Sequence, residues 1–197
     1  MTQSKRLTLV LFLNLVMISG LILVGVSAHS LGVLAAGGDY VADSLAILLG
    51  LLAIYFRDHT ARGKKATSFV ALINAIFLLI ITAFVIVESL RRLYTHTPEV
   101  FGGPVFVVSI IAAIVMGIGV AVLTAGKPDD DVHMRSVLLD TAADASSAAA
   151  VAVAGAVIFF HPGLKWLDSG VALAIGILIG VQAVKLLKDV TTGLRQI

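Results

Sequence analysis

The chain has 197 residues, of which 59% are hydrophobic and only 13% are charged, with a formal net charge of +2. Its mean hydropathy is +1.05. Because soluble domains carry about 25% charged residues, this composition excludes an ordinary soluble protein and predicts a polytopic membrane protein. The lack of cysteine excludes disulfides and thiolate metal sites, so any metal would be bound by oxygen or imidazole.

Apolar runs of helical length follow one another along the chain. A helix needs about 20 apolar residues to cross a membrane, and short polar or Pro- and Gly-containing segments separate the runs. The pattern predicts an all-α protein with six transmembrane helices, over residues 7–28, 31–56, 68–90, 105–124, 134–160 and 167–187. We expect a single domain over 1–197 with no C-terminal soluble domain, because the tail Lys188–Ile197 is too short to form one.

The distribution of Lys and Arg predicts the orientation of these spans. Cytoplasmic loops of membrane proteins are enriched in both residues. With the N-terminus in the cytoplasm, 11 of the 14 basic residues lie inside, and only Arg91, Arg92 and Lys165 lie outside. We therefore expect an integral protein of the inner or plasma membrane with both termini cytoplasmic.

Two pairs of aspartates interrupt these apolar runs. Asp39 and Asp43 lie in the second span, and Asp140 and Asp144 lie in the fifth. Residues at i and i+4 share one face of a helix, so each pair presents two carboxylates to the same side. Counted from the span ends, Asp43 is about 18 Å deep and Asp144 about 15 Å deep, which is near the middle of a hydrocarbon layer about 30 Å thick.

Acids at this depth are costly without compensation, and no Lys or Arg lies in the core of a predicted span. Four carboxylates from two antiparallel helices can surround a divalent cation. Paired carboxylates also titrate together, and a metal site exchanges protons for metal. We favour a metal site over the two alternatives, which are structural packing of the acids and a path for protons alone.

Several motifs carry a family resemblance. They are Gly38-Asp39-x3-Asp43-Ser44 preceded by Ser30, Asp140-x3-Asp144, Glu88-x2-Arg91-Arg92, Trp166-Leu167-Asp168, Asp58-His59, Asn14 and Asn74. With them the sequence resembles the transmembrane domain of the cation diffusion facilitator family over nearly its whole length. The resemblance implies export of divalent metals, usually zinc, in exchange for protons. It also implies that the metal ligands of the transport site are Asp39, Asp43, Asp140 and Asp144.

Two departures from the family pattern affect selectivity and assembly. Asp39 and Asp140 stand where many zinc members carry His, and an all-carboxylate site shifts preference toward Mn²⁺ or Fe²⁺. We also expect that the family's usual cytoplasmic C-terminal domain, which ordinarily dimerises and senses metal, is missing after the sixth span. Asp58 and His59 match part of a loop site in related exporters, and a weak metal site and a solvated pair both remain open for them.

We therefore expect an exporter of Zn²⁺, with Cd²⁺ also carried, that works by proton antiport. The alternatives are an Mn²⁺ or Fe²⁺ exporter of the same family and a non-transporting membrane subunit that partners a full-length exporter. We do not expect an enzyme, because no nucleophile–base pair stands out in any span. We expect no cofactor besides the transported metal. The expected partners are metal ions, protons, the lipid bilayer and a second copy of the chain that contacts it through transmembrane helices, but no nucleic acid.

Three further patterns give local expectations. Asp168 opens the sixth span and is expected to cap that helix. Glu88 is expected to pair with Arg91 or Arg92, at i+3 or i+4. In the sixth span, small residues recur at four-residue spacing and allow close helix contact, either within the chain or across a dimer. They are Ala172, Gly176 and Gly180.

Overall fold

The computed structural model describes residues 3–59, 63–125 and 132–195, which contain six α-helices, one short 3₁₀ helix and no strand. The α-helices are α1 (Gln3–Ser27), α2 (Leu31–His59), α3 (Gly63–Tyr94), α4 (Gly102–Ala125), α5 (Val132–Phe160) and α6 (Trp166–Arg195). The 3₁₀ helix η1 (Pro162–Leu164) links α5 to α6. The prediction of an all-α protein with six long helices is confirmed.

The helices extend beyond the apolar runs that predicted them. Thus α2 continues to His59, and α6 continues to Arg195. A helix satisfies its backbone groups within its own segment, so it need not end where its hydrocarbon-facing residues end. Among the described residues, one shorter apolar helix, Leu15–Ser27, accompanies four stretches that are long and apolar enough to cross a membrane. These four are Leu72–Tyr94, Gly102–Ala121, Thr141–Phe160 and Pro162–Thr192.

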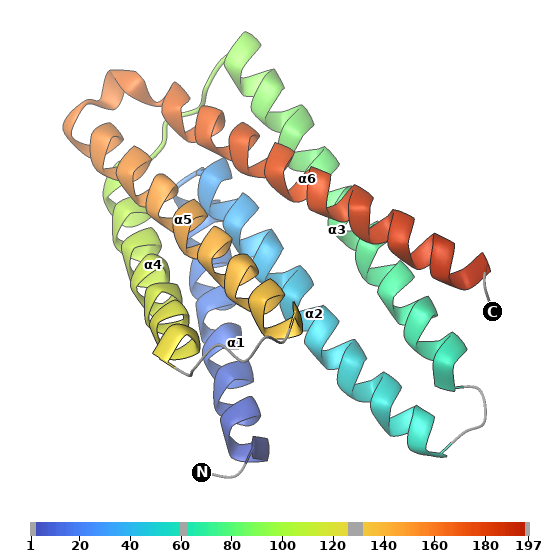
Figure 1. Ribbon diagram of the computed structural model, residues 1–197. Helices are drawn as coiled ribbons and strands as arrows, with labels where there is room; N and C mark the ends of the chain where they lie inside the picture. The colour runs from blue at the N-terminus through green and yellow to red at the C-terminus, as the bar shows by residue number, and fades with distance from the viewer. Residues whose placement is uncertain (1–2, 60–62, 126–131, 196–197) are drawn as a thin grey trace.

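The helices form an elongated bundle in which α2 is central (Figure 1). The most extensive contacts join α4 to α5 and α3 to α6, whereas α2 contacts α1, α3, α5 and α6. Both ends of the drawn chain lie in the lower part of Figure 1, away from the connections α1–α2 and α5–α6. This arrangement brings the two helices that carry the aspartate pairs into contact.

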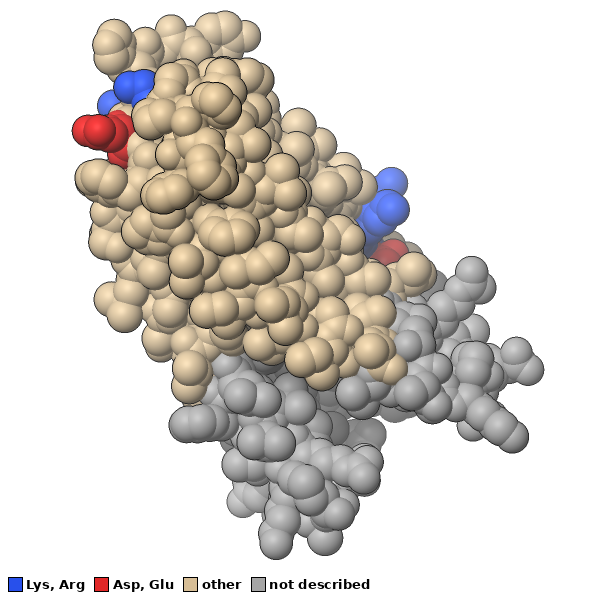
Figure 2. Space-filling model, turned by 90° about the vertical axis from the view of Figure 1, so that its left-hand side faces the viewer, with Lys and Arg blue, Asp and Glu red and all other residues tan. Residues whose placement is uncertain are grey.

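The outer surface of the bundle is largely apolar. Large exposed side chains include Phe84, Val87, Ile114 and Leu178. Figure 2 shows blue and red side chains near two edges of the described surface, with a broad tan face between them. In water such a face would drive association, whereas in a bilayer it is solvated by lipid. The chain is therefore an integral membrane protein.

The backbones of α4 and α5 approach each other closely at two glycines. A Cβ added to Gly102 would lie 2.5 Å from the carbonyl oxygen of Gly155. One added to Gly155 would lie 2.7 Å from the backbone nitrogen of Phe106. Real Cβ atoms do not come this close to backbone, so these positions require glycine. The contact fixes α5, with its aspartate pair, against α4.

The small residues of α6 pack within the chain. Ala172 is fully buried. A Cβ on Gly176 would lie 3.1 Å from Ile86 Cγ1, and one on Gly180 would lie 3.0 Å from Thr82 Cγ2. Both contacts are with α3, so this stripe is used for the α3–α6 pair. Of the two interpretations left open by the sequence, the structure therefore favours intramolecular packing.

Candidate metal site

The four predicted ligands lie on the two helices expected to carry them. Asp39 and Asp43 are on α2, while Asp140 and Asp144 are on α5. Asp39 and Asp144 are half-buried, and Asp43 is exposed. The side chain of Asp140 lies outside the described part of the chain. A carboxylate facing lipid is costly, so the exposed side chain of Asp43 needs a polar or ionic neighbour when the chain is in a membrane.

Tyr40 is a buried residue of α2 within electrostatic range of acids from both helices. Its side chain is 4% exposed, and the charges of Asp144, Asp39 and Asp43 all act on its hydroxyl. The acid of α5 therefore lies within electrostatic range of the same phenol as the acid pair of α2. Among the described residues, the hydroxyls of Tyr40 and Ser44 are buried without a hydrogen-bond partner. They are donors that a carboxylate or an ion-bound water can use.

The contact between α2 and α5 also defines a register. A Cβ built on Gly32 would lie 3.3 Å from both methyl carbons of Val151. The two helices run in opposite directions (Figure 1). Steps of seven or eleven residues return to nearly the same face of a helix, so equal steps along α2 and back along α5 predict residues at equal depth. The pairs are Gly32 with Val151, Asp39 with Asp144, and Asp43 with Asp140.

The described side chains do not by themselves complete a coordination sphere. Among them, no group of three or more His, Cys, Asp or Glu residues is arranged to hold a metal ion. The described side chains do not include that of Asp140, which the sequence predicts as the fourth ligand. The four-carboxylate site therefore stays a prediction, supported by the register and by the shared environment of Tyr40. Asp58 and His59 end α2, and their side chains also lie outside the described part.

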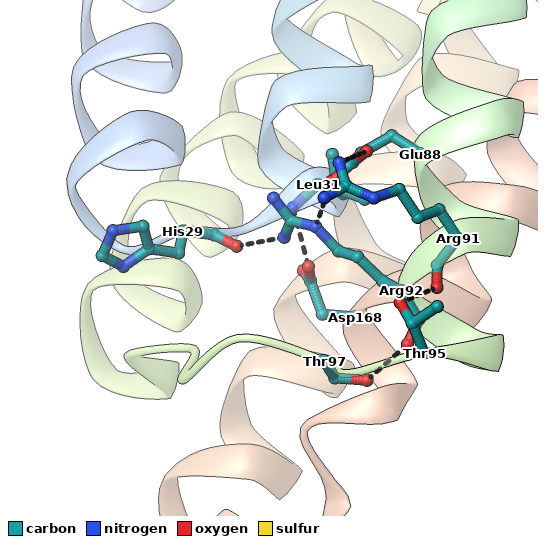
Figure 3. Close-up of polar contacts among 8 residues, drawn as sticks. All are labelled: His29, Leu31, Glu88, Arg91, Arg92, Thr95, Thr97 and Asp168. Carbon is teal, nitrogen blue, oxygen red and sulfur yellow. Dashed lines mark hydrogen bonds and ion pairs between the residues drawn. The ribbon is translucent and has the colours of Figure 1, made fainter.

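A second polar cluster surrounds the N-terminus of α2 and involves a carboxylate from α6 (Figure 3). Asp168 accepts hydrogen bonds from the Ser30 hydroxyl at 2.5 Å, the Leu31 amide at 2.7 Å and the Gly32 amide at 3.2 Å. The Ser30 oxygen in turn accepts one from the Val33 amide at 3.1 Å. The first three amides of α2, which have no partner within the helix, are thus all satisfied.

The prediction that Asp168 caps its own helix is therefore wrong. Asp168 lies in the first turn of α6, but its carboxylate reaches the first turn of α2, where the free amides and the positive end of the helix dipole favour an anion. No local pattern signals this contact, because 138 residues separate Ser30 from Asp168. The acid in Trp166-Leu167-Asp168 was visible in the sequence, but its target was not.

The corner between α1 and α2 is held by a third helix. His29 has φ 55°, and the Ser30 amide donates to the Gly25 carbonyl at 3.0 Å, which is the Schellman arrangement at a helix C-terminus. Arg92 of α3 donates to the His29 carbonyl at 2.7 Å (Figure 3). Glu88 pairs with Arg92 at 3.1 Å and with Arg91 at 3.0 Å. The predicted Glu88 ion pairs are confirmed, and Arg92 additionally ties α3 to the corner.

Comparison with known families decides the class of the protein. Residues 7–194 match the family described as the cation efflux transmembrane domain. The chain belongs to the cation efflux family. This confirms the resemblance to the transmembrane domain of cation diffusion facilitators.

Curated relatives of this cation efflux chain are metal transporters by name. It is 26% identical to the zinc transporter ZitB of Pectobacterium atrosepticum over 193 residues, which is 95% of the chain and 60% of the relative. It is 26% identical to a cadmium, cobalt and zinc/H(+)-K(+) antiporter of Bacillus velezensis, over 86% of the chain and 57% of the relative. It is 25% identical to the metal cation efflux system protein CzcD of Cupriavidus metallidurans, over 78% of the chain and 49% of the relative. The chain thus spans about half to six tenths of their length.

Proposed function

We propose that this protein exports divalent metal cations, Zn²⁺ first and Cd²⁺ as well, by exchange for protons at a site formed by the aspartates of α2 and α5. The observation that carries the proposal is the antiparallel register set by Gly32 and Val151, which predicts that the two aspartate pairs lie at equal depth. Family membership and the zinc and cadmium relatives support the cargo.

The chemistry follows from four carboxylates in a medium of low dielectric constant. When the metal is absent, the mutual repulsion of the carboxylates favours proton uptake. When a divalent cation enters, it displaces these protons, because only ionised carboxylates are good ligands. Alternating exposure of the site to the two sides of the membrane converts this competition into exchange. Where protons are driven into the cell, their entry through this exchange drives metal out.

The donor set favours a second candidate cargo. All four predicted ligands are carboxylates, and oxygen ligands suit Mn²⁺ and Fe²⁺ as well as Zn²⁺. The names of the relatives favour zinc, whereas the ligand chemistry favours the harder ions. Competition among the four metals Zn²⁺, Cd²⁺, Mn²⁺ and Fe²⁺ for binding to the purified protein separates these cargoes.

We propose, further, that the chain works as a homodimer through its transmembrane helices. The small-residue stripe of α6 is occupied by α3, so the dimer contact would use another exposed helix face. A membrane subunit that partners a full-length exporter is the other outcome, in which a second chain co-purifies and this chain alone carries no metal.

Transport of Zn²⁺ into proteoliposomes under an imposed pH gradient tests the proposal. Asp43→Asn and Asp144→Asn remove a charge with little change of shape, and we expect both to abolish uptake. Asp189→Asn is the matched control, because Asp189 is an exposed acid on α6. Collapse of the pH gradient is expected to stop uptake by the unmodified chain. Wild-type rates in the Asp43 and Asp144 variants would refute the site, and uptake that ignores the gradient would refute proton exchange.

A further inference from the structure

The carboxylate of Asp168 is more deeply buried than a carboxylate that caps a helix at the protein surface. Asp168 is 1% exposed, and its partner Ser30 is fully buried. A buried carboxylate is costly unless its oxygens are well hydrogen-bonded. Here its hydrogen bonds come from the hydroxyl of Ser30 and the amides of Leu31 and Gly32, so that one acid of α6 satisfies the start of α2. When the carboxylate is ionised, bonds of this kind are stronger than neutral ones.

Close packing at this turn brings further helices to the same point. A Cβ on Gly32 would lie 3.1 Å from Asp168 Oδ1 and 3.3 Å from the Val151 methyls, so that α6 and α5 both abut the first turn of α2. Arg92 of α3 holds the preceding carbonyl of His29. The start of α2 is therefore fixed from three sides, and one of its neighbours is the helix that carries the second aspartate pair.

We propose that Asp168 is a positioning residue for the metal site. By anchoring the first turn of α2 to α6, it holds Gly32 opposite Val151 and so sets the depth at which Asp39 and Asp43 face the acids of α5. Asp39 is eight residues from Leu31, about 12 Å along the helix, and Asp43 is about 18 Å away. A slip of one helical turn, about 5.4 Å, would remove both acids from their opposite partners. The inference rests on the proposed function.

Asp168→Asn tests the anchor, with Asp189→Asn on the same helix as the matched control. An asparagine keeps the shape but not the charge, and its NH₂ group cannot accept an amide hydrogen bond. Two quantities are measured on the full chain. The first is hydrogen–deuterium exchange of the peptide that contains Leu31 and Gly32. The second is the KM for Zn²⁺ in proteoliposomes. Ser30→Ala, which removes a single hydroxyl, is measured in the same way and decides the question if Asp168→Asn does not fold.

We expect Asp168→Asn to speed exchange in the first turn of α2 and to raise the KM for Zn²⁺ about 10- to 100-fold, as loss of residues that orient metal ligands does. Ser30→Ala should shift both quantities in the same direction by less, and Asp189→Asn should shift neither. Faster exchange with an unchanged KM would show that Asp168 is only a helix cap and would overturn the proposal. Unchanged exchange would overturn the anchor itself. If the unmodified chain carries no metal, the proposed function fails, while the exchange comparison still decides the anchor.

Discussion

The contact between α4 and α5 at Gly155 permits a sharp test of the packing that fixes one of the two acid-bearing helices. In the variant Gly155→Ala, the new Cβ would lie 2.7 Å from the backbone nitrogen of Phe106 and 2.8 Å from Val105 Cγ1. Atoms of this kind prefer about 3.5–4.0 Å, so α4 and α5 must separate by roughly 1 Å at this level. The Phe106 backbone cannot relieve this contact by a bond rotation, as the end of a flexible side chain could.

The expected cost follows from two opposing effects. Overpacking a fitted contact costs about 1–3 kcal/mol, whereas replacing glycine by alanine inside a helix gains up to about 1 kcal/mol. Gly117→Ala isolates the second effect, because Gly117 is also inside a helix, α4, and no atom lies within 4 Å of its added Cβ. We therefore expect Gly155→Ala to be less stable than Gly117→Ala by about 1–3 kcal/mol.

Unfolding of the purified protein by SDS titration, followed by circular dichroism, measures this difference. Gly102→Ala is a second probe of the same contact, since its Cβ would lie 2.5 Å from the Gly155 carbonyl oxygen. Equal stability of the Gly155 and Gly117 variants would refute the reasoning, because it would mean that the two helices can separate without loss.

The polar cluster at the start of α2 yields three further predictions, all read by the same titration. Arg92→Ala should lower the free energy of unfolding by about 1–3 kcal/mol, because the Arg92 side chain is 15% exposed and also donates to the His29 carbonyl. Arg91→Ala should lower it by less than about 1 kcal/mol, because the Arg91 side chain is 72% exposed. Similar losses in both would contradict this assignment. His29 has φ 55°, a conformation that glycine adopts readily and β-branched residues do not. His29→Gly should therefore leave stability unchanged or raise it by about 1 kcal/mol, and His29→Val should lower it by about 1–2 kcal/mol. The reverse order would exclude strain at this residue. Ser30→Ala should lower the free energy of unfolding by about 0.5–2 kcal/mol, because the Ser30 hydroxyl is the N-cap group that accepts from the Val33 amide. No loss would mean that this hydrogen bond contributes nothing to stability.

Local patterns in the sequence were sufficient for the helices and the acid pairs. Apolar runs predict helices because hydrocarbon forces every backbone group to bond within its own segment. The i, i+4 spacing predicts that Asp39 and Asp43 share a face, since helix geometry alone decides it. Likewise Glu88 was predicted to pair with Arg91 or Arg92 because they are neighbours on one helix, and the structure shows a pair with each.

Contacts between distant segments depended on the tertiary structure. Asp168 was predicted to cap its own helix, because sequence shows which amides are near in the chain but not which are near in space. Its partner Ser30 lies 138 residues away. The small residues of α6 fitted either α3 or a second copy of the chain, and only packing against Thr82 and Ile86 decided between them.

The sequence alone predicted that the chain crosses a membrane, which the fold and the family confirm. It also predicted that four aspartates lie deep in the membrane, and this stays a prediction. Hydropathy and spacing are enough for both expectations, because each depends on one helix at a time. The relation between the two acid pairs needed the tertiary structure. Close approach of Gly32 to Val151 sets the register of α2 against α5, and the carboxylate of Asp168 holds that turn in place. Register between helices is a property of packed surfaces, and a single helix does not contain it.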